Sequence, residues 1–253
     1  LWRMYKLMCG LFGASGKIDP KIIRPLALYN ESRGDQSAGI GWHDTQLNIV
    51  KAAIHPFRFF SQVDIFLQKA FEAQNILGHT RQATTGIINK ENAHPWFSKD
   101  KSFIFAHSGW ITNYADFGAF NVDSQSLEDG ILKKNFSAYS GKIGLIWTDL
   151  SGVLSIYKHN QELSFAQKGS AVYISSDDKH LKAVGLSPQN IKENFIYRFK
   201  GGRIVQRKRV LSPKSVSIIS NNFYMSDWYK SRAYNGFDRV TTKDFLSNYG
   251  VEI

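Results

Sequence analysis

The first half of the chain mixes two hydrophobic patterns, one typical of strands and one typical of helices. Short apolar runs bounded by turn residues predict strands at 9–13, 37–42, 47–54, 76–79 and 103–107. Apolar residues at helical spacing predict helices at 19–33, 57–76 and 127–136. Asp19 and Pro20 supply an N-cap and a first-turn proline for the earliest of these helices.

After residue 140 the pattern becomes mostly strand-like. Short runs bounded by Gly, Ser or Asn predict strands at 142–148, 153–159, 163–167, 172–175, 195–200 and 203–207, with one short helix at 179–185. Gly201 and Gly202 between the last two strands indicate a tight hairpin. This order predicts an α+β fold in which two mainly antiparallel sheets stack, with helices on the outside.

Composition narrows the class of protein. Hydrophobic residues make up 43% of the 253 residues, which is enough for a full core. A single Cys excludes an intrachain disulfide framework and a cysteine-based zinc site, and no histidines have ligand spacing, so no metal or cofactor is expected. The chain contains no run of about 18 apolar residues, so no membrane-spanning helix is expected. We therefore expect a soluble protein of a reducing compartment, the cytoplasm.

The net charge of +11 leaves two interpretations open. The densest basic stretch is 200–214, which fits either a solvated edge strand or a surface for nucleic acid or an acidic partner. From residue 221 onward the chain carries many aromatic residues, which predicts packing on the body or on a partner. They are Phe223, Tyr224, Trp228, Tyr229, Tyr234, Phe237, Phe245 and Tyr249.

The lone Cys9 follows Met8 near the start of the chain. If translation starts at Met8 and that residue is trimmed, Cys9 becomes N-terminal and its free α-amine can act as base for its own thiol. The alternative is a buried cysteine that only packs. Residue 1 is Leu, so we expect residues 1–8 to be an extension or a propeptide, or not native.

Clusters of polar residues and glycine recur where predicted strands enter loops, at 33–40, 78–86, 92–96, 106–114 and 122–125. Together with Met8-Cys9-Gly10, and in this order, they resemble the class II glutamine amidotransferase family of the N-terminal-nucleophile hydrolase superfamily. The resemblance implies a four-layer αββα sandwich over 9–215, with 216–253 as an aromatic-rich tail. It also implies a stand-alone glutaminase whose ammonia acceptor, a synthetase or transferase, is a separate protein.

The resemblance implies a catalytic set. Cys9 would attack the side-chain amide of glutamine to form a thioester, while its α-amine moves the proton. Gly109 would offer a backbone N–H to the oxyanion. Ser108 stands where the family usually has an Asn that donates to the oxyanion, and losing one such donor typically costs about 10²–10³ in rate. Slower catalysis is therefore expected.

The resemblance also implies a substrate pocket. Arg81 would grip the α-carboxylate of glutamine through a bidentate pair, and Asp123 would receive the α-ammonium. Thr84 would add a hydrogen bond. Thr85 stands where some relatives have His and so alters the pocket wall. Two further residues, Arg33 and His94, match positions that frame the pocket.

Three functions stay open at this point. The first is glutamine hydrolysis through Cys9, with ammonia passed to another protein. The second is a catalytically silent binding protein on the same fold, which engages nucleic acid or an acidic partner. The third is hydrolysis of another γ-glutamyl or amide substrate. No membrane partner is expected.

Overall fold

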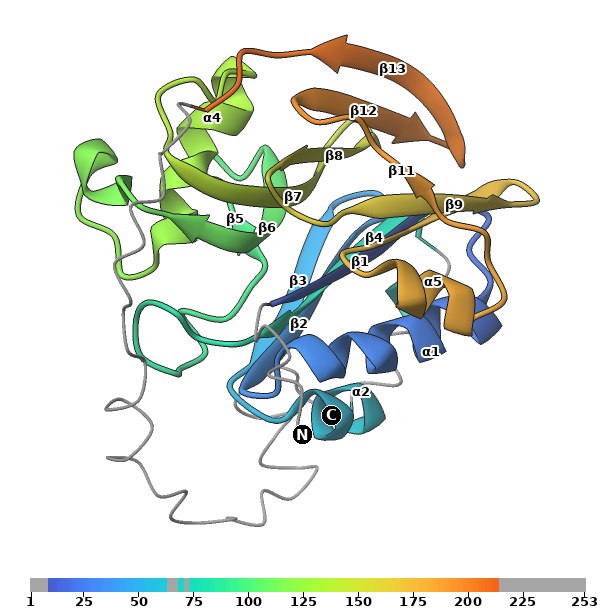
Figure 1. Cartoon of the computed structure of the whole chain (residues 1–253). Coiled ribbons are helices and arrows are strands. Elements are labelled where there is room, and N and C mark those ends of the chain that lie inside the picture. Colours follow the sequence, from blue (N-terminus) through green and yellow to red (C-terminus); the bar gives the residue numbers. More distant parts are fainter. Residues whose placement is uncertain (1–8, 63–67, 71–72, 214–253) are drawn as a thin grey trace, which may run out of the picture. The chain divides into compact units, whose positions relative to one another are not determined.

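The computed structural model describes residues 9–62, 68–70 and 73–213 (Figure 1). The expected extension 1–8 and the expected tail 216–253 lie outside these residues, so both remain predictions. Among the described residues, no helix has the length and apolar character needed to cross a membrane.

Two antiparallel sheets make up most of the described chain. The first sheet has the order β11-β9-β10-β1-β4-β2-β3. Its strands are β1 (Gly10–Gly16), β2 (Ser37–His43), β3 (Leu47–Ala52), β4 (Asn75–Arg81), β9 (Ser164–Lys168), β10 (Ala171–Ser175) and β11 (Gln189–Asn190). β1 lies in the middle, paired with β4 from Gly10 opposite Thr80 onward and with β10 on its other side.

The second sheet has the order β13-β12-β8-β7-β6-β5. Its strands are β5 (Trp96–Phe97), β6 (Phe103–Ile111), β7 (Gly141–Asp149), β8 (Leu154–His159), β12 (Phe195–Lys200) and β13 (Arg203–Arg209). The turn between the last two strands is made by Gly201 and Gly202, both with positive φ, as their glycine pair predicted. β13 forms an edge of this sheet, and its basic residues are exposed, which fits the edge-strand interpretation.

Short helices connect and cover the sheets. They are α1 (Pro20–Tyr29), η1 (Asn30–Arg33), α2 (Pro56–Gln62), η2 (Tyr114–Phe117), η3 (Asp123–Leu127), α4 (Glu128–Lys133) and α5 (Asp178–Ala183). Asp19 caps α1 as predicted, because its side chain accepts a hydrogen bond from the Lys21 N–H at 2.9 Å.

Hydrophobic packing among the described residues fits a four-layer αββα sandwich. Between the sheets, alternate residues of facing strands such as Leu11, Leu77 and Ile104 form one cluster. Residues on the outer face of the second sheet, including Phe105, pack with residues of the 111–139 segment and α4. On the outer face of the first sheet, Phe12 meets Phe60 of α2 edge-on, with ring centroids 5.8 Å apart. The predicted fold class is confirmed.

Local boundaries differ from the prediction in a few places. The helical pattern at 57–76 overran, because β4 begins at Asn75. The helix expected at 127–136 is shared between η3 and a short α4 that ends at Lys133. The two-residue strands β5 and β11 were not predicted, since two residues carry no periodicity.

Candidate active site

Strand alternation brings three of the predicted residues to one end of the gap between the sheets. In β4, the parity that buries Leu77 between the sheets continues to Arg81, and in β6 the parity of Ile104 continues to Ser108. Cys9 directly precedes β1 and shares the parity of Leu11. The same alternation that builds the core therefore places the Cys9 thiol, the Arg81 guanidinium and the Ser108 hydroxyl at one end of the gap between the sheets, the mouth of this gap.

The thiol of Cys9 is held against the residue after β4. Its Sγ donates to the Gln82 carbonyl at 3.3 Å and accepts from the Gln82 N–H at 3.4 Å. Burial raises the pKa of the Cys9 thiol, and the Gln82 N–H and the charges of Arg81 and Arg33 only partly oppose that rise. A buried thiol of this kind is protonated at neutral pH and needs a base before it can act as a nucleophile.

The main-chain carbonyl of Cys9 accepts two side-chain hydrogen bonds. The hydroxyl of Ser108 donates to it at 2.6 Å, and Nε of Arg33 donates at 3.3 Å. Gln161, which follows β8, donates its Nε2–H to the Ser108 hydroxyl at 3.2 Å. In this arrangement the Ser108 hydroxyl donates its hydrogen bond to the nucleophile's own backbone and not to a substrate oxygen.

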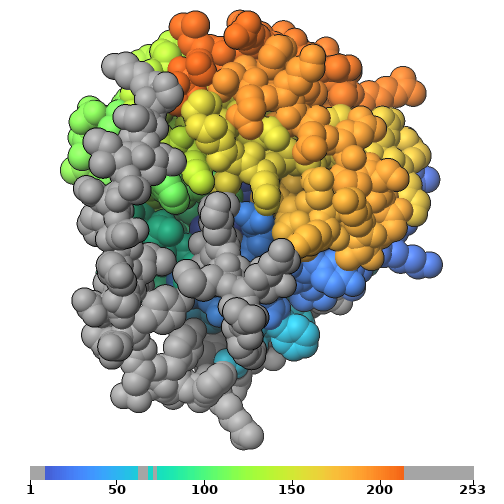
Figure 2. Space-filling view, viewed as in Figure 1, coloured from blue at the N-terminus to red at the C-terminus, as the bar shows by residue number. Residues whose placement is uncertain are grey.

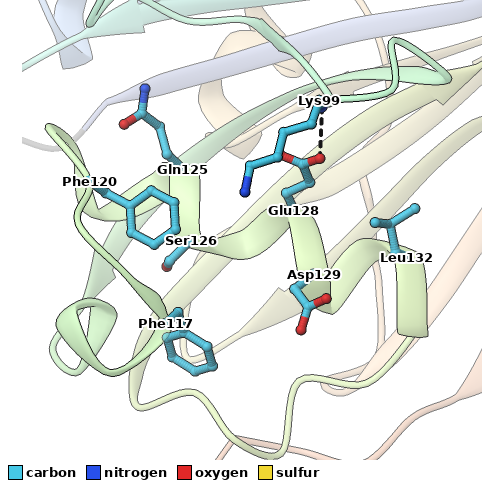
Figure 3. Close-up of a pocket in the computed structure, with 8 residues that line it drawn as sticks. All are labelled: Lys99, Phe117, Phe120, Gln125, Ser126, Glu128, Asp129 and Leu132. Carbon is cyan, nitrogen blue, oxygen red and sulfur yellow. Dashed lines mark hydrogen bonds between the residues drawn. The ribbon is translucent and has the colours of Figure 1, made fainter.

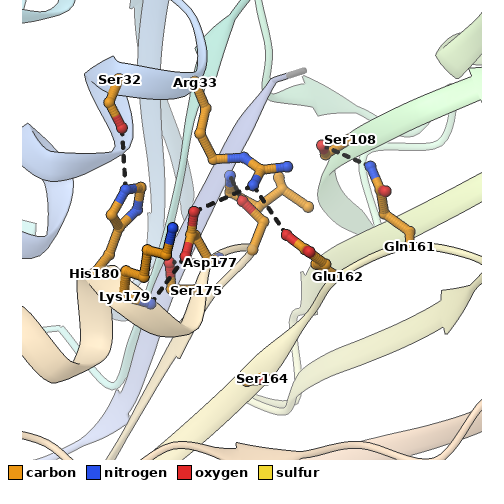
Figure 4. Close-up of polar contacts among 12 residues, drawn as sticks. Ser32, Arg33, Ser108, Gln161, Glu162, Ser164, Ser175, Asp177, Lys179 and His180 are labelled. Atoms are coloured by element: carbon orange, nitrogen blue, oxygen red, sulfur yellow. Dashed lines mark hydrogen bonds and ion pairs between the residues drawn. The ribbon is translucent and has the colours of Figure 1, made fainter. Parts of the chain in front are cut away.

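Arg33 links Cys9 to two carboxylates. Figure 4 shows its guanidinium between Glu162 and Asp177. Its Nη1 lies 3.3 Å from Glu162 and 3.6 Å from Asp177, while its own side chain is only 10% exposed. Asp177 also caps α5 by accepting from the Lys179 N–H at 2.8 Å. Because Nε of the same guanidinium contacts Cys9, this ion-pair cluster and the nucleophile share one rigid side chain.

Arg81, Thr85 and Asp123 form a second network beside the thiol. Arg81 is 2% exposed and donates to the carbonyls of Thr85 and Ile87. The Thr85 hydroxyl donates to Oδ1 of Asp123 at 2.8 Å, and the Ile111 N–H donates to Oδ2 at 2.7 Å. Residues from the end of β4, the following loop, β6 and η3 thus meet here. The charges of Arg81 and Asp123 both act on the Cys9 thiol.

The remaining predicted residues lie in different surroundings. Gly109 has a φ of +140°, and a Cβ there would lie 2.1 Å from the Lys142 carbonyl oxygen, so the position requires glycine. Thr84 is exposed in the loop after β4. His94 is 2% exposed and stacks between His79 and Trp96, with ring centroids 3.9 and 3.8 Å away. It belongs to a buried aromatic stack, and its role in framing the pocket stays a prediction.

A cleft of about 750 Å³ opens beside Arg33 and Gln161. Its wall comes from the start of β7, the end of β8, the loop before β9 and the region of α5. Figure 2 shows the residues of β8 and β9 in yellow and those of α5 in orange on the same face. Arg81 and Asp123 are not among its lining residues, so the cleft adjoins the predicted glutamine pocket without coinciding with it.

A second pocket of about 320 Å³ lies at α4 (Figure 3). It is lined by Lys99, Phe117, Phe120, Gln125, Ser126, Glu128, Asp129 and Leu132. Glu128 accepts a hydrogen bond from the Lys99 N–H at 2.7 Å across it. None of the predicted site residues lines this pocket.

Sequence reasoning missed Gln161, Glu162 and Asp177. All three follow strands, where polar residues often serve a site, and this signal marked the clusters in the first half of the chain. They were overlooked because they carry no distinctive spacing and lie far along the chain from their partners. Gln161 is 53 residues from Ser108, and Glu162 is 129 residues from Arg33. Their contacts form only after β8 has paired with β7 and β10 has paired with β1.

Comparison with known proteins agrees with the predicted resemblance. Residues 8–123 match the family profile of "Glutamine amidotransferases class-II". The isomerizing glutamine–fructose-6-phosphate aminotransferase of Listeria monocytogenes is 39% identical over 108 residues, which are 42% of this chain and 18% of that protein. Isomerizing glutamine–fructose-6-phosphate aminotransferase 2 of Mus musculus is 32% identical over 141 residues, 48% of this chain and 20% of that protein.

A solved structure shares the fold. The glutamine phosphoribosylpyrophosphate amidotransferase from B. subtilis, solved with ADP and GMP, aligns with a TM-score of 0.59 over 79% of this chain and 49% of that one, at 16% identity. The chain therefore spans about a fifth of the length of these curated relatives and about half of that structure.

Proposed function

We propose that this chain hydrolyses the side-chain amide of glutamine to glutamate and ammonia, with Cys9 as nucleophile. The match of residues 8–123 to the class-II glutamine amidotransferase profile supports this proposal. The observation that carries the proposal is that a thiol, a guanidinium and a carboxylate lie close together in one site. The Cys9 thiol contacts the backbone of Gln82, the residue next to Arg81, and Thr85 links Arg81 to Asp123 at the mouth of the gap between the sheets. An amino acid head group needs such a pair of opposite charges.

The first half of the reaction makes a thioester. The α-amine of an N-terminal Cys9 takes the thiol proton, and Sγ attacks the side-chain carbonyl carbon of glutamine. The Gly109 N–H donates a hydrogen bond to the carbonyl oxygen as negative charge develops on it. The amine then returns the proton to the leaving nitrogen, so ammonia departs as the thioester forms.

The second half consumes water. The α-amine takes a proton from a water molecule, the resulting hydroxide attacks the thioester, and the C–S bond breaks. Glutamate leaves and the proton returns to sulfur. Throughout, Arg81 would hold the α-carboxylate and Asp123 the α-ammonium, and the hydroxyl of Ser108 and Nε of Arg33 would keep the Cys9 backbone in place.

Delivery of the ammonia to an acceptor on a separate synthetase or transferase, in the cytoplasm, belongs to the same proposal. The curated relatives named above are aminotransferases, and their names state that they transfer nitrogen from glutamine to fructose 6-phosphate. The acceptor used by this chain is part of the proposal and does not follow from those names.

The test compares two forms of the protein. A form whose first residue is Cys9 should release ammonia and glutamate in equal amounts from glutamine, and a form that keeps residues before Cys9 should not, because its α-amine is a peptide nitrogen. Cys9→Ala in the first form is the control for contaminating glutaminase. Equal release by all three would refute the proposal, and release from γ-glutamyl peptides but not from glutamine would favour the other amide hydrolase.

The silent binding protein is favoured by one contact. The Ser108 hydroxyl donates to the Cys9 carbonyl, so among the predicted oxyanion donors only Gly109 is left. Its binding surface would include the exposed basic edge strand β13. Salt-sensitive binding of nucleic acid by the Cys9→Ala protein, together with no hydrolysis by the form that begins at Cys9, would support this function instead.

A further inference from the structure

The cleft beside Arg33 has features of a binding site that the proposed reaction does not use. Its volume of about 750 Å³ lies within the range of small-molecule pockets. Lys179 and Lys182 stand three residues apart on α5 and so lie on one side of that helix, at the cleft wall. Lys142 contributes from the start of β7, on the facing sheet.

The charges in the cleft do not balance once its internal ion pairs are assigned. Glu162 and Asp177 both pair with Arg33. Glu193 lies 3.9 Å from Lys158 and accepts from the Asn160 N–H at 2.9 Å.

Within the described part of the chain, the ammonium groups of Lys142, Lys179 and Lys182 pair with no carboxylate. Asp178 is the one lining carboxylate that likewise has no ion-pair partner there. Arg33 can neutralise only one of its two carboxylates, so the lining as a whole carries five cations against four carboxylates. This net charge of +1, with Lys179 and Lys182 unpaired and Lys142 lying over the Trp110 ring, favours an anionic ligand.

One wall of the cleft is made of the side chains that hold the nucleophile. Arg33 contacts the Cys9 carbonyl directly, and Gln161 contacts it through Ser108. Nη2 of Arg33 is buried and has no hydrogen-bond partner, so the guanidinium has an unused donor between the cleft and Cys9. An anionic ligand in the cleft competes with Glu162 and Asp177 for the same guanidinium and so changes its pairing.

We propose that this cleft binds a small molecule bearing a phosphate or carboxylate group, and that occupancy is coupled to Cys9 through Arg33 and Gln161. The ligand's oxyanion lies among Lys142, Lys179 and Lys182. The binding stands on the geometry and charge of the cleft alone. The coupling rests on the proposed function, because it is read out as glutamine hydrolysis.

Binding is tested without catalysis, on the Cys9→Ala protein. Inorganic phosphate and succinate, titrated by calorimetry at constant ionic strength, distinguish the two oxyanion sources. The variant Lys179→Ala/Lys182→Ala should weaken the saturable binding at least tenfold. The matched control Lys200→Ala/Lys208→Ala removes the same charge from exposed positions of β12 and β13 and should leave binding unchanged. No saturable binding of either anion, or equal loss in both variants, overturns the site.

Coupling is tested on the form that begins at Cys9. The bound anion should change kcat or KM for glutamine several-fold, with saturation at the concentrations that saturate binding, and the change should vanish in Lys179→Ala/Lys182→Ala. An unchanged reaction at full occupancy overturns the coupling. If no glutamine is hydrolysed at all, the proposed function fails, while the binding experiment still decides the site.

Discussion

The hydroxyl of Ser108 donates to the carbonyl of Cys9 at 2.6 Å, and this bond joins the residue just before the middle strand of one sheet to a strand of the other. Both residues are buried at the mouth of the gap between the sheets. A serine in this position therefore acts on the nucleophile's backbone, whereas the asparagine that the family resemblance led us to expect would act on the substrate.

Replacing Ser108 with alanine should loosen the nucleophile without disturbing substrate affinity. Loss of one buried hydrogen bond of about 0.5–1.5 kcal/mol predicts a roughly two- to tenfold lower kcat for glutamine, with KM unchanged. Steady-state kinetics on Ser108→Ala measure both constants. Ser187→Ala, at an exposed position outside the site, is the control. A large rise in KM with kcat intact would show that Ser108 touches the substrate.

Asp123→Asn should mainly weaken glutamine binding. The carboxylate accepts from the Thr85 hydroxyl and the Ile111 N–H, and it would pair with the substrate's α-ammonium. Hydrogen bonds to charged groups contribute about 1.5–3 kcal/mol, so KM should rise about ten- to a hundredfold with a smaller change in kcat. Asp116→Asn makes the same charge change at an exposed residue of η2 and should have no effect. Equal KM values in the two variants would remove Asp123 from the head-group site.

Gly109→Ala should destabilise the fold. The residue has a φ of +140°, and an added Cβ would lie 2.1 Å from the Lys142 carbonyl oxygen. Backbone strain and the clash together should lower the free energy of unfolding by more than about 2 kcal/mol. Gly169→Ala is the control, because its φ is +59° but no atom lies within 4 Å of the added Cβ. We expect only about 1 kcal/mol there, and a similar loss at both positions would contradict the close approach.

The stability of the fold should fall as the pH drops below about 6.5. Burial lowers the pKa of His79 and His94 well below the ordinary value, with further lowering from the nearby Arg81 charge and, for His94, from Lys51. The unfolded chain takes up protons on these rings near pH 6.5 while the folded chain does not, so acid favours unfolding.

Each such ring contributes up to about 1.4 kcal/mol per pH unit below that point. Denaturant unfolding at pH 7.5, 6.5 and 5.5 measures the trend. The variant His94→Phe, which keeps an aromatic ring at this position, should flatten the trend, whereas His55→Ala at a half-buried position outside the site should not. A stability that is constant over this range would show that neither ring stays neutral.

Strand periodicity predicted most of the fold, because the alternation of buried and exposed residues in each strand is visible in its own short stretch of sequence. The double glycine at 201–202 and the Asp19 cap fixed their turn and helix start for the same reason. The pattern failed near Asn75, where helical spacing ran on into β4, since apolar residues suit either element when both faces are covered.

The site was predictable only as far as its residues lie in clusters near strand ends. Arg81, Thr85 and Asp123 do meet, as their order in the chain suggested. The direction of each side chain was not predictable: Ser108 donates to the Cys9 carbonyl while its own oxygen accepts from Gln161, 53 residues further along. Long-range pairs of this kind exist only after the sheets have stacked.

β1 exchanges its first ladder contacts at Gly10, one residue beyond the nucleophile, and it is gripped on both sides by β4 and β10. Within the described residues, Cys9 itself belongs to no ladder pair, and its main chain is held by the side chains of Ser108 and Arg33 instead. The proposed freeing of the Cys9 α-amine would therefore act at a residue that the described sheet does not use for its own pairing.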